Sequence, residues 1–73
     1  MGRMTKTTKA NIMVADKIVI EQTDTGNEFF VKIYRGGKLA YLADAEGPIT
    51  YATVTEARRT VRRIRKDIEP VTI

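Results

Sequence analysis

Apolar residues follow two different periods along this chain. In the middle they alternate with polar residues, which is typical of β-strands with one buried face. Nearer the C-terminus they recur every three or four residues, as on one side of an α-helix. The order of these patterns predicts an α+β protein in which a sheet is packed against one C-terminal helix.

The helical pattern covers Thr53–Lys66, TVTEARRTVRRIRK. Thr53 and Glu56 have the spacing of a capping box, and Pro70 cannot continue a helix. At about 100° per residue the apolar side chains form one narrow stripe, namely Ala57, Val61, Ile64 and Ile68. We therefore expect one amphipathic helix whose apolar stripe is covered by the sheet.

The alternating pattern predicts strands at Lys17–Gln22, Glu28–Arg35 and Lys38–Ala43, which are rich in β-branched and aromatic residues. The segment Thr23–Asn27 has the composition of a turn, and Gly36-Gly37 is typical of a two-residue hairpin turn. We therefore predict a three-stranded antiparallel meander followed by the helix, in the order β-β-β-α.

The Gly36-Gly37 turn also predicts the register of the second hairpin. It places Arg35 opposite Lys38 and Lys32 opposite Tyr41. One face of this hairpin is then purely apolar, with Phe29, Val31, Ile33, Ala40 and Leu42. Ile18 and Ile20 join that face if the first hairpin has a four-residue loop, and a slip of one residue would reverse them. We expect the helix to cover this face.

The N-terminal segment Met1–Asn11 is polar, and it carries Arg3, Lys6 and Lys9 without an acid. We predict a flexible, disordered basic arm over residues 1–11, followed by a single small domain over residues 12–73. The arm is either a frayed terminus or an extension that wraps a polyanion. Two further segments, 49–52 and 71–73, are short enough to be either edge strands or irregular chain.

Basic charge is concentrated on the predicted helix. Six of its side chains are cationic, namely Arg58, Arg59, Arg62, Arg63, Arg65 and Lys66, whereas the whole chain has a net charge of +4. Guanidinium groups suit bidentate contacts with phosphate or carboxylate. Like charges four residues apart on a helix repel one another. This basic face is either an ordinary solvated surface or the binding site of an anionic partner.

The sheet offers a second candidate surface on the face away from the helix. Phe30, Lys32, Tyr34, Leu39 and Tyr41 share that face in the predicted register. Aromatic and basic side chains on a sheet can stack bases and hold phosphates. The alternative is an ordinary sheet face that is partly covered by the N-terminal segment or by a second copy of the chain.

Several functional classes are disfavoured by what the sequence lacks. It has no cysteine and no histidine, and it contains no P-loop motif. Without these side chains, a nucleophile with its base or a transition-metal site is hard to assemble. We therefore expect no enzymatic activity, no cofactor, no metal and no small-molecule ligand. Neither a membrane-spanning apolar run nor a secretory signal is found, so we expect a cytoplasmic protein.

From Phe29 to Lys66 the chain resembles the C-terminal half of double-stranded-RNA-binding domains. The matching residues are Phe29–Ile33, Gly37-Lys38 and Glu56–Arg59. The chain departs from the family by lacking its N-terminal helix and by having Thr55-Glu56 in place of a Lys-Lys helix start. That departure removes part of the family's phosphate clamp, so its RNA specificity is not implied.

The β-β-β-α order also resembles the arm-binding domains of tyrosine recombinases, which insert their sheet into a DNA groove. That likeness implies a reading face formed by Lys32, Tyr34 and Tyr41. In composition the chain is similar to small phage proteins that bind host RNA polymerase. The sequence therefore predicts either a nucleic-acid-binding regulator or a phage-type regulator that binds an acidic protein of the transcription machinery.

Overall fold

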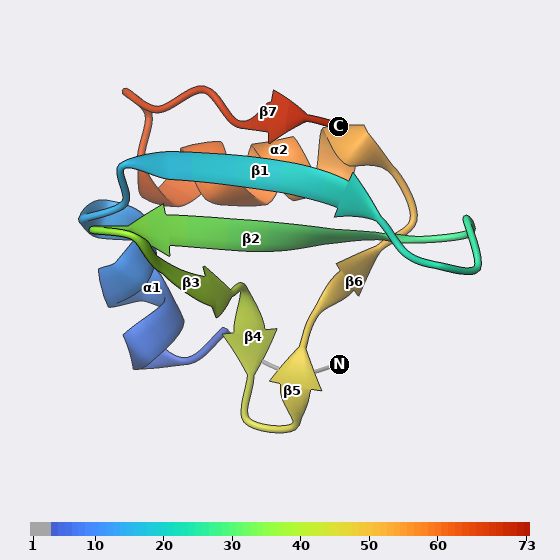
Figure 1. Ribbon diagram of the computed structural model, residues 1–73, viewed down its shortest axis with the longest axis horizontal. Coiled ribbons are helices and arrows are strands. Elements are labelled where there is room, and N and C mark those ends of the chain that lie inside the picture. Colours follow the sequence, from blue (N-terminus) through green and yellow to red (C-terminus); the bar gives the residue numbers. More distant parts are fainter. Residues whose placement is uncertain (1–3) are drawn as a thin grey trace.

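Two helices cover one face of a mixed β-sheet in the computed structural model, which describes residues 4–73 (Figure 1). The helices are α1 (Lys6–Met13) and α2 (Val54–Ile64). The main sheet has the order β3-β2-β1-β7, and β6 pairs with β2 beyond the end of β3. Its strands are β1 (Lys17–Gln22), β2 (Phe29–Arg35), β3 (Lys38–Tyr41), β6 (Thr50–Tyr51) and β7 (Val71–Thr72). A separate two-stranded sheet contains β4 (Ala43–Asp44) and β5 (Gly47–Pro48).

The register predicted for the second hairpin is confirmed. Arg35 lies opposite Lys38, Tyr34 opposite Leu39, and Lys32 opposite Tyr41. Gly36 and Gly37 have φ angles of 53° and 82°, which glycine adopts without a steric penalty and which a tight hairpin turn requires. In the first hairpin the Thr23 N–H donates to the Glu28 carbonyl at 2.8 Å, which leaves a four-residue loop and turns Ile18 and Ile20 inward.

The sheet has more strands than the three predicted. β6 pairs antiparallel with β2, and β7 pairs parallel with β1, so the sheet is mixed. The third strand ends at Tyr41 rather than Ala43, because the chain bends at the buried Leu42 and continues as β4. Leu42 is held there by hydrogen bonds from its N–H to the Val31 carbonyl and from the Ile49 N–H to its own carbonyl.

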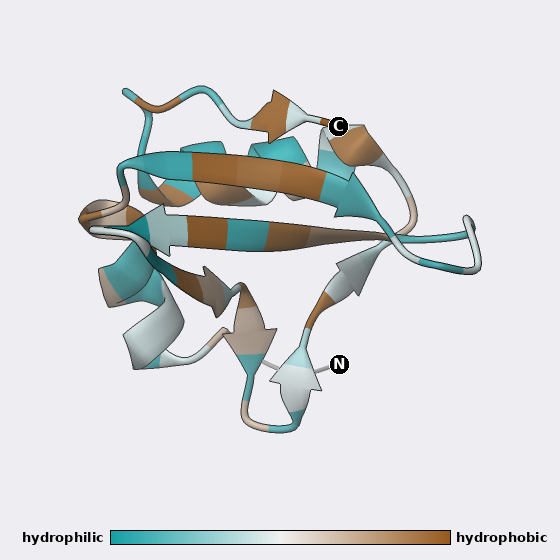
Figure 2. Cartoon of the chain, viewed as in Figure 1, coloured by the Kyte–Doolittle hydropathy of each residue, from teal (hydrophilic) through white to brown (hydrophobic). Residues whose placement is uncertain are grey.

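The core lies between the helices and the apolar face of the sheet, as the alternation predicts. In Figure 2, β2 alternates between apolar and polar colours, while the middle of β1 is apolar. The buried cluster comprises Ile12, Ala15, Ile18, Ile20, Val31, Ile33, Leu42, Ala57 and Val61. Full burial of one large aliphatic side chain stabilises a protein by about 1.5–3 kcal/mol. This cluster is therefore the main source of stability for both layers.

The prediction of a flexible basic arm over residues 1–11 is wrong for the part that the structure describes. Residues 6–13 form α1, and Arg3 lies outside the described residues. The Thr5 hydroxyl caps the helix by accepting a hydrogen bond from the Thr8 N–H. Ile12 is fully buried, and the buried Thr8 hydroxyl hydrogen-bonds to the main chain of Ala43. These tertiary contacts order a segment whose composition is polar.

The C-terminal helix is confirmed, although it is shorter than predicted. Thr53 is the N-cap, and its hydroxyl accepts a hydrogen bond from the Glu56 N–H at 3.1 Å. The helix ends at Ile64 because Arg65 adopts an extended conformation, with φ −140° and ψ 107°. Neither helix of residues 4–73 is long and apolar enough to cross a membrane.

Candidate functional site

The outward side of α2 gathers most of the basic residues that the sequence singles out. Ala57 and Val61 point into the core, which leaves the arginines on the opposite side of the helix. Arg59, Arg62 and Arg63 are exposed, as is Lys66 just beyond the helix, and Arg58 is half-buried. We call these five residues the basic face of α2. Four of them and Thr55 border a shallow, open depression of about 470 Å³.

Glu69 partly neutralises one side of this face. Its carboxylate lies 2.8 Å from the Arg62 guanidinium and 3.7 Å from Nε of Arg58. The Arg58 guanidinium also donates to the Thr72 hydroxyl at 3.3 Å, while its buried Nε has no hydrogen-bond partner among the described residues. Arg59, Arg63 and Lys66 form no ion pair with any residue of 4–73. Within the basic face of α2, the uncompensated charge is therefore on these three side chains.

Arg65 is placed differently from the other candidate arginines. Its guanidinium donates to the carbonyls of Ile12, at 3.1 Å, and Ala15, at 2.8 Å, at the end of α1. Its Nε donates to the Asp67 carboxylate at 3.0 Å, and this bond lowers the pKa of Asp67. Arg65 thus joins α2 to α1, and its Nε and one terminal nitrogen of its guanidinium are engaged within the protein.

The remaining candidates, Lys32, Tyr34 and Tyr41, lie together with Phe30 on the face of the sheet that the helices leave open. The rings of Phe30 and Tyr41 are 5.8 Å apart between centroids, and Nζ of Lys32 lies 5.7 Å from the Phe30 centroid. Lys32 also pairs with Glu21 at 2.7 Å, and this hydrogen bond raises the pKa of Lys32. We call this group the aromatic face. Its cation already has an anionic partner.

The two candidate surfaces point in opposite directions. The basic face of α2 lies on the helical layer, whereas the aromatic face lies on the other side of the sheet (Figure 1). A partner with a flat surface can therefore cover one of them but not both. The predicted register implies this arrangement, because it puts the aromatic residues on the face of the sheet away from the helix.

Sequence reasoning missed three features of these surfaces. Glu69 is seven residues after Arg62, and only the turn that follows the helix brings it back to the basic face. Val71 pairs with Val19, which buries Val19 on the open side of the sheet and leaves Val71 47% exposed. The third is the link from Arg65 to α1, for which the polar sequence of α1 offers no signal.

Neither a metal site nor a relative identifies the chain. Within residues 4–73 no group of three carboxylates lies close enough together to hold a metal ion. Comparisons with protein-family models, with curated proteins and with solved structures find no match. The geometry and charge of the two surfaces are therefore the features that bear on function.

Proposed function

We propose that this protein is a small non-enzymatic regulator that binds nucleic acid through the basic face of α2. The observation that supports this most directly is the set of exposed cations, Arg59, Arg63 and Lys66, that have no acidic partner within residues 4–73. Cations clustered at helical spacing repel one another, and phosphate groups relieve that repulsion. An anionic polymer satisfies several of them at once.

The dimensions of the face suit a nucleic-acid backbone. Arg59 and Arg63 are four residues apart on α2, which corresponds to about 6 Å along the helix axis, or nearly two base-pair steps of duplex. Arg59 and Arg63 present forked donors, and Lys66 presents a flexible point charge. Such contacts position a protein on the backbone without reading the sequence of bases. We therefore expect binding that depends strongly on salt and weakly on sequence.

The helical layer also bears on the resemblance to double-stranded-RNA-binding domains. The sequence predicts that the chain lacks the N-terminal helix of that family, whereas α1 precedes β1 and packs on the same side of the sheet as α2. The chain still differs from that family at the start of α2, which has Thr55-Glu56 where the family has a pair of lysines. The proposal therefore includes duplex binding and leaves out a preference for RNA.

The test is a titration of labelled duplex DNA and duplex RNA with the protein at several salt concentrations. Replacing Arg59 and Arg63 by glutamine removes two phosphate contacts. On DNA it should weaken binding at least about tenfold and reduce the slope of log K against log salt by about 1.8. The matched control is Lys6→Gln with Lys9→Gln, which removes the same charge from the exposed side of α1. Equal losses in both variants would show that only net charge matters and would refute the assignment to α2.

A second candidate function is supported by the aromatic face. Large apolar or aromatic side chains are exposed on this face and at its periphery: Tyr41 on the face is 41% exposed, and Leu39 and Val71 at its periphery are 46% and 47% exposed. Apolar surface of this kind favours a protein partner. In this alternative the protein is a phage-type regulator that binds an acidic surface of a host protein such as RNA polymerase, with the arginines steering the encounter.

A pull-down from bacterial lysate with and without nuclease distinguishes the two functions. If nucleic acid alone is recovered and Arg59→Gln with Arg63→Gln abolishes its recovery, the first function is supported. If one defined protein remains bound after nuclease treatment, and Tyr41→Ala releases it, the second function replaces the first. Tyr41 is a suitable probe because it is exposed and makes no core contact that its removal would disrupt.

A further inference from the structure

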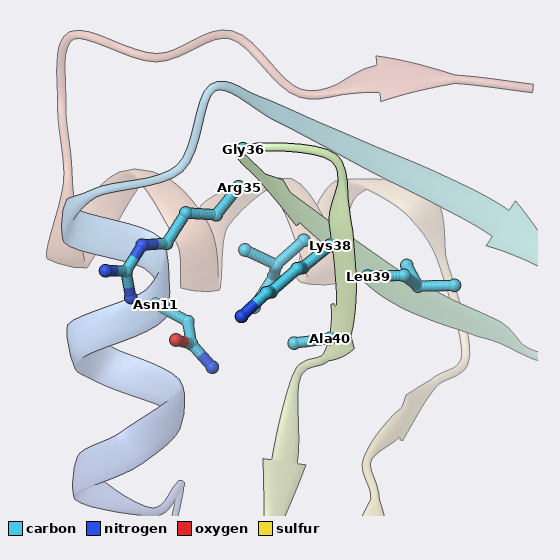
Figure 3. Close-up of a pocket in the computed structure, with 7 residues that line it drawn as sticks. Asn11, Arg35, Gly36, Lys38, Leu39 and Ala40 are labelled. Carbon is cyan, nitrogen blue, oxygen red and sulfur yellow. The ribbon is translucent and has the colours of Figure 1, made fainter.

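A cleft between α1 and the β2–β3 hairpin is separate from both surfaces described above. It encloses about 430 Å³ and lies on the helix-covered side of the sheet (Figure 3). It is lined by Asn11, Ile33, Arg35, Gly36, Lys38, Leu39 and Ala40. Cavities that bind small molecules have volumes of about 300–1,000 Å³, so this cleft is large enough for a compact ligand.

Two cations meet at this cleft. Arg35 and Lys38 are directly opposite each other across the Gly36-Gly37 turn. Ile33 and Ala40 form the pair two residues away on the same strands, and side chains two residues apart on a strand point to the same face. Because Ile33 and Ala40 face the helices, Arg35 and Lys38 also extend from that side of the hairpin. Like charges in such a pair destabilise a hairpin. An anion bound between them would convert that repulsion into attraction.

The polar groups of the cleft are not engaged elsewhere in the described chain. Within residues 4–73 the side chains of Asn11, Arg35 and Lys38 form no hydrogen bond or ion pair. The carboxylate of Asp16 accepts a hydrogen bond from the Gly36 N–H at 2.7 Å and does not line the cleft. In Figure 3 the Lys38 and Asn11 side chains extend into the space between α1 and β3, and Arg35 reaches toward α1 above them.

The hairpin residues next to Arg35 and Lys38 in the cleft are apolar. Ile33 is buried and Ala40 is partly buried, and both belong to the edge of the core. The Leu39 side chain points away from the cleft, so that it does not fill the space (Figure 3). One side of the cleft therefore suits an anionic group with two or more acceptor oxygens, and the other suits a small organic group.

We propose that this cleft binds a small phosphomonoester. Arg35 and Lys38 hold its phosphate, which carries a charge of about −1.5 to −2 near pH 7. The Asn11 amide donates to a phosphate oxygen, and the organic group lies against Ile33 and Ala40. A single carboxylate would match only one of the two cations, whereas a phosphate dianion matches both.

The walls of the cleft are fixed before any ligand binds. The Arg65 guanidinium holds the end of α1 through the carbonyls of Ile12 and Ala15, beside Asn11. The hairpin is fixed by its register and by the bond from Gly36 to Asp16. Because the ligand would not have to order the chain, little of its binding free energy would be lost.

The proposal is independent of nucleic-acid binding, since none of the residues that line the cleft belongs to α2. The full chain, labelled with ¹⁵N, would be titrated with phenyl phosphate, inorganic phosphate and phenol at about 0.15 M salt and followed by NMR. Saturable shifts are expected for the amides of Asn11, Gly36, Lys38 and Ala40. Phenyl phosphate should bind more tightly than inorganic phosphate, and phenol should produce no shifts.

The variant Arg35→Gln with Lys38→Gln should weaken binding of phenyl phosphate at least about tenfold, because both charged contacts are lost. Its fold is checked by the dispersion of the NMR spectrum and by its unfolding midpoint, which should equal or exceed that of the original protein because the repulsion is gone. The control Arg59→Gln with Arg63→Gln should change the affinity by less than about twofold.

Three results would each overturn the proposal. The first is the absence of saturable shifts at the cleft with either phosphate compound. The second is equal binding of phenyl phosphate by the original protein and by the folded Arg35→Gln, Lys38→Gln variant. The third is a response of the cleft amides to duplex DNA but not to phenyl phosphate, which would make Arg35 and Lys38 part of a nucleic-acid surface.

Discussion

The two helices cover the same face of the sheet, yet they are stabilised in different ways. Each starts after a threonine whose hydroxyl accepts a hydrogen bond from a main-chain N–H at 3.1 Å. α2 buries Ala57 and Val61, which are spaced as in an amphipathic helix. α1 buries only Ile12 and the polar Thr8. The comparison shows that a helix without a clear apolar stripe can be positioned by a few long-range contacts.

Those contacts connect α1 to two distant parts of the chain. The Thr8 hydroxyl lies 3.2 Å from both the N–H and the carbonyl of Ala43. The Thr5 N–H also donates to that carbonyl, at 3.1 Å. At the other end of α1, Arg65 donates to the carbonyls of Ile12 and Ala15. Both ends of α1 are therefore held by hydrogen bonds to residues far along the chain, whereas α2 depends on its apolar stripe.

The largest effect should come from removing the single apolar anchor of α1. Ile12→Ala should lower the free energy of unfolding by about 2–5 kcal/mol, because it leaves a cavity in the core. Urea denaturation measures this loss. The control Met13→Ala, at a residue that is 55% exposed, should change the free energy by less than about 0.5 kcal/mol. Similar small losses in both variants would mean that α1 is not docked.

The next effect concerns the buried hydroxyl of α1. Thr8→Val should cost about 1–3 kcal/mol, since it keeps the shape of the buried side chain but leaves the partly buried main chain of Ala43 without this partner. Thr60→Val is the matched control on α2, where the hydroxyl donates to the Glu56 carbonyl of its own helix and lies beside Tyr51 rather than bonding to a distant main-chain group. Chemical denaturation of both variants checks whether the loss is specific to α1. Equal losses would remove the distinction between the two helices.

A smaller loss is expected where the two helices meet. Arg65→Gln should cost about 1–2 kcal/mol, because two charge-assisted hydrogen bonds to α1 are lost from a side chain that is partly exposed. Hydrogen exchange should speed up in α1 more than in α2. The control Arg59→Gln should leave both stability and exchange unchanged while it weakens nucleic-acid binding. Unchanged exchange in Arg65→Gln would contradict the link between the helices.

The smallest effect concerns Tyr51, which packs beside α2. Burial raises the pKa of Tyr51, and the Thr60 hydroxyl and the charge of Arg63 act against this shift. A tyrosine with a raised pKa contributes stability that is complete below its unfolded pKa, about 10, and is lost as the pH rises above that value. The free energy of unfolding should therefore fall as the pH rises above about 10, and less steeply in Tyr51→Phe. An identical slope in that variant would exclude this role for Tyr51.

The sequence by itself predicted the elements whose causes are local. The turn glycines determined the register of β2 and β3, because few other residues adopt their φ angles. Alternation along those strands identified the core face, and a capping threonine with a periodic apolar stripe identified α2. In each case the deciding interaction lies between residues close in sequence, so a local pattern reveals it.

Only the tertiary structure decided how these elements are used. It ordered α1 through bonds that join residues 35 and 50 positions apart, for which no local pattern exists. It turned Arg65 inward to α1, brought Glu69 back to Arg62, and placed Arg35 and Lys38 beside Asn11. The composition shows how many charges the chain carries. Which of them are paired, and which face a partner, depends on long-range packing that places side chains from distant segments together.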